Sequence, residues 1–104
     1  MRLDLIARHL LLSQEQRALV LKRLGAALDR FAARIARIEV RFDDVNGPRG
    51  GRDVVAVGRL VLAGGGELTV RGDFASPEAA ASGIGDRLRA RLAHAWGRRQ
   101  AARG

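Results

Sequence analysis

The chain has 104 residues, of which 47% are hydrophobic and 29% are charged, a composition typical of one globular domain. Its formal net charge of +8 favours an acidic partner such as nucleic acid. It contains no cysteine, which excludes disulfides and thiolate metal sites. No apolar run approaches the roughly 18 residues of a membrane span, and the N-terminus lacks the signal-peptide pattern, so we expect a cytoplasmic protein with no membrane partner.

The N-terminal third of the chain predicts a short strand and then an amphipathic helix. Leu3, Leu5 and Ala7 alternate with polar residues, which is the period of a half-buried strand. Ser13 and Gln16 have the spacing of a capping box, so we expect the helix to begin after Ser13. An apolar stripe at helical spacing predicts roughly five turns, and it comprises Val20, Leu21, Leu24, Leu28, Phe31 and Ile35.

Three further strands are expected in the middle of the chain. Apolar and charged residues alternate over 37–42, and turn-forming residues over 43–53 predict an exposed loop. A third strand is expected over 54–62, followed by a glycine-rich turn and a fourth strand over 68–71.

A second helix closes the chain. Ser76, Pro77 and Glu78 place an N-cap, a proline at the first position and an acid in the first turn. We expect the domain to cover residues 1–97, with residues 98–104 as a basic tail. The apolar face of this helix comprises Ala81, Ile84, Leu88, Leu92, Ala95 and Trp96.

The predicted order of elements is therefore β-α-β-β-β-α. A right-handed crossover makes the first two strands parallel, and the short connections make the remaining strands a meander. The fold class is α+β, a two-layer sandwich in which both helices cover one face of a four-stranded mixed sheet.

Residue patterns that carry catalysis are absent from the sequence. His9 and His94 lie in different elements, and neither has a cysteine or histidine at ligand spacing, so no metal site is predicted. The glycine-rich turn lacks the Lys-Ser/Thr of a phosphate loop and joins two strands. We predict a non-enzymatic protein with no cofactor and no small-molecule substrate.

The arginines form a stripe beside the apolar face of each helix when residues are placed at 100° intervals. If the two helices pack side by side, the arginines would line both sides of a shared, positively charged groove. The acidic residues of the helices lie outside the stripes, which favours a binding surface. The alternative is that any surface helix of an arginine-rich chain flanks its core with arginine. One stripe comprises Arg23, Arg30 and Arg34, and the other comprises Arg87, Arg91, His94 and Arg98.

The few aromatic residues argue against a stacking platform for single-stranded RNA. Phe31, Phe42 and Trp96 lie at apolar-period positions and are predicted to be core. Recognition of folded RNA by its backbone and shape is the better match.

Four segments in this order resemble the short ribosome hibernation factors, the ribosome-associated inhibitor A (protein Y) family. They are "LLSQEQRALVLKRL" at 11–24, "RIARIEVRF" at 34–42, "GGGELTVRGDF" at 64–74 and "DRLRARL" at 86–92. One departure is Glu78, which stands where the family carries a tyrosine at the start of the last helix.

The resemblance implies a domain shaped like a double-stranded-RNA-binding domain that blocks translation. Its partner would be ribosomal RNA of the small subunit, in the channel of mRNA and tRNA anticodon arms, with the protein monomeric off the ribosome. Two alternatives stay open: a general structured-RNA-binding domain, and a basic structural or assembly subunit that meets an acidic protein. The family's basic positions fall on Arg17 and Arg23 in the first helix and on Arg87, His94 and Arg98 in the last.

Overall fold

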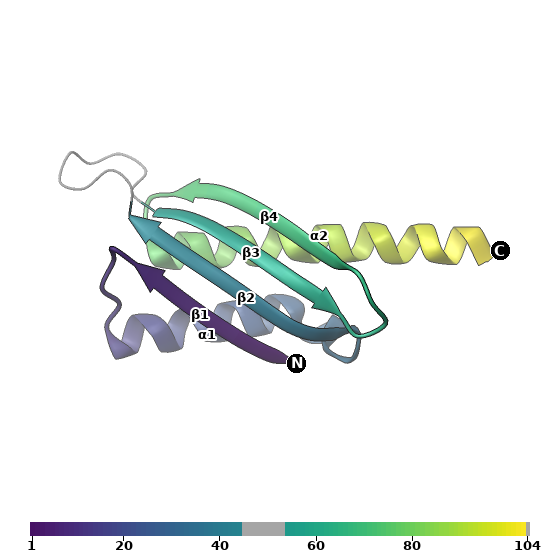
Figure 1. The fold of residues 1–104 in the computed structure, drawn as a ribbon, viewed down its shortest axis with the longest axis horizontal. Coiled ribbons are helices and arrows are strands. Elements are labelled where there is room, and N and C mark those ends of the chain that lie inside the picture. Colours follow the sequence, from purple (N-terminus) through teal and green to yellow (C-terminus); the bar gives the residue numbers. More distant parts are fainter. Residues whose placement is uncertain (45–53, 104) are drawn as a thin grey trace.

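The computed structural model describes residues 1–44 and 54–103, with side chains described up to residue 95. The chain forms a sheet layer and a helix layer (Figure 1). The loop predicted over 43–53 lies outside the described residues, except for its first two. The elements in chain order are β1 (Arg2–Arg8), α1 (Gln14–Leu28), the 3-10 helix η1 (Asp29–Arg34), β2 (Ile35–Asp44), β3 (Val54–Leu62), β4 (Glu67–Phe74) and α2 (Pro77–Arg103).

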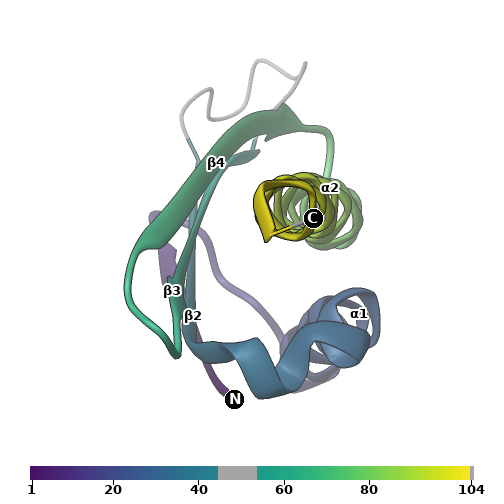
Figure 2. The same ribbon diagram turned by 90° about the vertical axis from the view of Figure 1, so that its right-hand side faces the viewer.

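The sheet has the strand order β1-β2-β3-β4. β1 pairs with β2 in parallel, and the other two pairs are antiparallel. Both helices lie side by side on one face of the sheet, which Figure 2 shows end-on. The predicted α+β sandwich and its strand connections are confirmed.

Both helices begin where the capping residues predict. The Ser13 hydroxyl accepts from the backbone N–H of Gln16 at 3.0 Å, and the Gln16 side chain accepts from the backbone N–H of Ser13 at 3.1 Å. The Ser76 hydroxyl likewise accepts from the backbone N–H three residues further on, at 3.1 Å. α2 runs to Arg103, so residues 98–103 continue the helix, because Gly97 alone does not break a segment rich in Ala and Arg. The domain boundary at residue 97 stays a prediction.

The predicted extent of the first helix is wrong at its C-terminal end. α1 ends at Leu28, and a 3-10 helix carries the chain to Ile35, which already belongs to β2. The carbonyl of Arg34 accepts from the backbone N–H of Ala63 at 2.8 Å, and this bond to the β3–β4 turn fixes the last residue of η1. The strand pairing of Ile35 therefore overrides its helical spacing from Leu28 and Phe31.

The two helices approach closely where small residues meet. A Cβ atom on Gly85 would lie 2.9 Å from the Cβ of Ala27, whereas one on Gly25 would meet nothing within 4 Å. Gly85 therefore sets the separation of α1 and α2, and Gly25 does not.

We expect opposite effects on stability from the same substitution at these two glycines. Gly25→Ala should stabilise the protein by about 0.5–1 kcal/mol, because alanine favours the helix. Gly85→Ala should instead destabilise it, since overpacking costs about 1–3 kcal/mol. Urea unfolding of both variants measures the difference, and equal stabilisation by both would show that the helices separate freely.

Candidate nucleic-acid interface

The outer face of the sheet carries charges of both signs. Hydrogen bonding and the charge of Glu67 raise the pKa of the Arg59 guanidinium above its ordinary value. Such local neutralisation makes this face a poor site for a polyanion. The ion pairs on it join Arg2 to Asp4 (3.3 Å), Arg41 to Glu39 (3.7 Å) and Arg59 to Glu67 (2.7 Å).

The arginine stripe of α2 lies beside the edge strand β4. The Arg87 guanidinium lies 5.3 Å from the centre of the Phe74 ring and donates to the carbonyl of Arg71. Arg91 donates to the carbonyl of Thr69 at 3.4 Å. These residues border a cleft of about 460 Å³, here called the β4 cleft, lined by Thr69, Val70, Arg71, Arg87, Ala90 and Arg91.

The sequence predicts that this stripe continues to His94 and Arg98. His94 is exposed three residues beyond Arg91, on the same side of the helix. Arg98 follows in the backbone of α2, but its side chain lies outside the described residues.

Arg87 and Arg91 each use a donor on a β4 carbonyl, and a guanidinium has five N–H donors. The remaining donors suit a phosphate.

The prediction that both stripes border one groove between the helices is wrong. α2 faces α1 through Gly85, and Arg87 follows two residues later, about 200° around the helix. Its stripe therefore lies on the flank of α2 away from α1. Of the two described arginines of α1, Arg23 is the one that reaches α2, donating to the carbonyl of Glu78 and to the Ser82 hydroxyl at 3.1 and 3.2 Å.

Glu78 takes part in the same contact between helices. Its pKa is lowered by a hydrogen bond from its own backbone N–H and by one from the Gln16 side chain, whose Nε2 lies 3.2 Å away. The carboxylate therefore stays ionised in the first turn of α2, where the helix dipole favours a negative charge. This residue, at the position of the family's tyrosine, joins α1 to α2.

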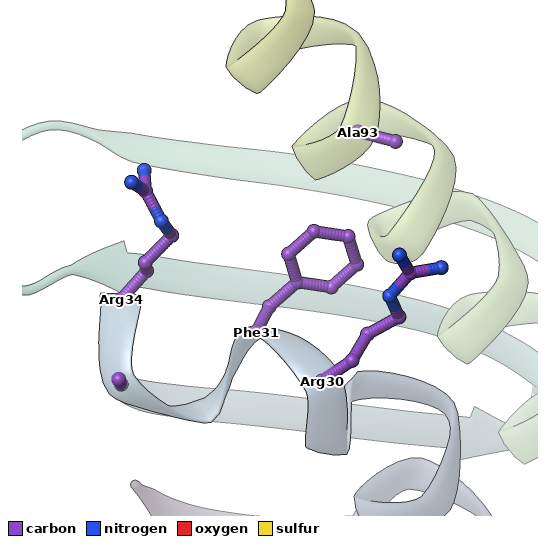
Figure 3. Close-up of a pocket in the computed structure, with 5 residues that line it drawn as sticks. Arg30, Phe31, Arg34 and Ala93 are labelled. Carbon is purple, nitrogen blue, oxygen red and sulfur yellow. The ribbon is translucent and has the colours of Figure 1, made fainter.

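The other basic residues predicted for the N-terminal third of the chain lie in two places. Arg17, at the start of α1, donates to the carbonyl of Leu5 on the edge strand β1 at 3.1 Å. Arg30 and Arg34 lie on η1 and border a second cleft opposite α2 (Figure 3). This η1 cleft has a volume of about 320 Å³ and is lined by Arg30, Phe31, Ala33, Arg34 and Ala93.

No protein-family model matches the chain, and no curated protein matches it either. Among solved structures, the Thermus thermophilus protein Y N-terminal domain is similar with a TM-score of 0.68 and 24% sequence identity, over 88% of this chain and 96% of that one. A ribosomal subunit interface protein from Coxiella burnetii is similar with a TM-score of 0.76 and 14% identity, over 93% of this chain and 99% of that one. The chain shares the protein Y fold. The predicted resemblance is thus confirmed at the level of the fold.

On this protein Y fold, Arg71 and Phe31 are among the cleft-lining residues that the sequence did not predict as site residues. Arg71 lies on β4 and lines the β4 cleft, and Phe31 lines the η1 cleft. No local pattern marks Arg71, because its place depends on the pairing of β4 with β3. For Phe31 a signal existed, since residues three apart are also neighbours on the predicted helix, which places Phe31 beside Arg34.

The two histidines of the chain lie in different parts of the fold. His9 lies 3.0 Å from Asp43 through its Nδ1, whereas His94 stands on α2. Within residues 1–44 and 54–103, no group of three or more His, Cys, Asp or Glu side chains is placed to hold a metal ion. No helix in that part of the chain is long and apolar enough to cross a membrane.

Proposed function

We propose that this chain is a ribosome-associated translation inhibitor, a hibernation factor of the cytoplasm that binds ribosomal RNA of the small subunit. The observation that carries the proposal is the pair of basic clefts on either flank of α2, on a fold similar to protein Y and to a ribosomal subunit interface protein. The partner is RNA because the net charge is +8 and the cleft arginines suit phosphate oxygens.

The geometry suggests how such a complex forms. α2 lies between the β4 cleft and the η1 cleft, so that two segments of RNA backbone can run along its two flanks. Arg71, Arg87 and Arg91 would hold one segment, and Arg30 and Arg34 the other. A domain lodged in this way in the mRNA and tRNA channel blocks translation by occupying the space, without catalysis and without a cofactor.

Sedimentation of stationary-phase lysate through a sucrose gradient tests the proposal. We expect the protein in the small-subunit or monosome fractions at low salt, and at the top of the gradient in high salt, because phosphate contacts weaken steeply with salt. Purified small and large subunits, run separately, identify the subunit. A protein that stays at the top at low salt would contradict the proposal, and equal binding to unrelated duplex RNA would favour a general structured-RNA-binding domain.

A further inference from the structure

The η1 cleft differs from the β4 cleft in exposing an aromatic ring. Figure 3 shows Phe31 between the side chains of Arg30 and Arg34, with its ring directed toward α2 at Ala93. The Arg30 guanidinium lies 5.5 Å from the centre of the Phe31 ring, within the range of a cation–π interaction. Phe31 is half-buried, since one side of it packs against the core.

Among its described lining residues, the β4 cleft has no aromatic side chain. The neighbouring Phe74 ring lies under the Arg87 guanidinium, and a Cβ atom on Gly72 or Gly83 would clash with that ring. Of these two clefts in the described part of the chain, the η1 cleft is therefore the one that combines arginines with an aromatic lining residue.

The η1 cleft is held in shape by the backbone around it. In a 3-10 helix, residues three apart lie above one another, which aligns Phe31 with Arg34 and Arg30 with Ala33. The carbonyl of Arg34 is bonded to the backbone N–H of Ala63, and Ile35 is buried in β2. A site fixed in this way loses little conformational entropy when a ligand binds.

We propose that the η1 cleft binds one unpaired nucleotide, with the base on Phe31 and the phosphate on Arg30 and Arg34. Bases stack on aromatic rings and on guanidinium planes, and paired arginines suit a phosphate. The cleft volume of about 320 Å³ is at the lower end for small ligands, and Ala93 leaves it open. The nucleotide is either free or an unpaired residue of an RNA; only the second source rests on the proposed function.

Binding to two RNA hairpins tests this inference. They share one stem, and one of them carries a single bulged nucleotide. We expect the bulged hairpin to bind about tenfold more tightly, because one base gains a stacking partner. Phe31→Leu keeps an apolar side chain but removes the ring, and Ala93→Leu fills the cleft without changing charge; each should abolish the roughly tenfold preference for the bulged hairpin over the plain one. Ala79→Leu, at an exposed position of α2 that lines neither cleft, should retain it.

AMP and UMP, titrated separately and followed by NMR at the Ala93 methyl group, distinguish the two sources. Saturable shifts that Ala93→Leu abolishes support a free nucleotide, and a bulge preference without such shifts supports an RNA nucleotide. Equal binding of both hairpins without saturable shifts overturns the inference, as does a preference that survives both Phe31→Leu and Ala93→Leu. A bulge preference in a protein that fails to sediment with ribosomes would contradict only the proposed function.

Discussion

Replacing Arg71, Arg87 and Arg91 together by alanine is expected to weaken binding to small-subunit RNA about 100-fold, from three solvent-exposed ionic contacts at about 1 kcal/mol each. All three line the β4 cleft, so they meet one segment of phosphate backbone. For the unmodified protein, the logarithm of the binding constant should fall with the logarithm of the salt concentration with a slope of at least about three to five. Each phosphate contact contributes about 0.7–0.9 to this slope, so the slope of the triple variant should be smaller by about two.

A matched variant on the outer face of the sheet controls for net charge. Arg2, Arg41 and Arg59 each have a carboxylate partner on that face, and replacing all three by alanine removes the same charge. This variant should keep the salt slope and most of the affinity. If it loses as much as the cleft variant, affinity depends on net charge alone and the β4 cleft is not the binding site.

Replacement of the three cleft arginines by lysine separates charge from geometry. Lysine keeps the positive charge and the counterion release but lacks the planar fork of donors. The slope should therefore remain while the affinity falls in part. Thermal unfolding of each variant confirms folding, since exposed substitutions usually change stability by less than about 0.5 kcal/mol.

The order of elements could be predicted because each of them carries a local signal. The capping box at Ser13 and the proline turn at Ser76 mark the helix starts, and both are formed as predicted. The end of α1 had no such signal: Leu28, Phe31 and Ile35 continue the helical spacing. Only the bond between Arg34 and Ala63 and the pairing of Ile35 with Leu62 decide it, and these contacts join distant parts of the chain.

The basic residues could be predicted, but their grouping could not. The periodicity of α2 places Arg87, Arg91 and His94 on one flank, and it does not say which neighbour that flank meets. The neighbour is set by Gly85, which turns the opposite flank toward Ala27. The stripe consequently faces β4.

Phe42→Ala is expected to destabilise the protein by about 3–5 kcal/mol, the usual cost of truncating a buried phenylalanine. Phe42 is fully buried, and its neighbours on the two adjoining strands are Ala7 and Ala56, with Gly72 beyond on β4. One ring thus lies between two alanines on the inner face of the sheet, whereas the space beside Gly72 is taken by Phe74 and Arg87. Because small side chains cannot move in to fill a gap, the cavity should remain, which places the cost at the upper end of that range.

Two variants separate this effect from a general sensitivity to loss of aromatic residues. Phe42→Leu keeps most of the volume and should cost only about 1–2 kcal/mol. Phe31→Ala removes the same atoms from a half-buried ring at the η1 cleft, where solvent takes their place, and should cost clearly less than Phe42→Ala. Urea unfolding measures the free energy of unfolding of all three variants, and its dependence on urea concentration should be the same in each. A native domain is stable by about 5–15 kcal/mol, so a cost near 5 kcal/mol should remove about a third or more of the free energy of unfolding. A cost below about 1 kcal/mol would mean that the sheet and helices close over the vacated space, and that the Phe42 ring does not fix the spacing between the layers.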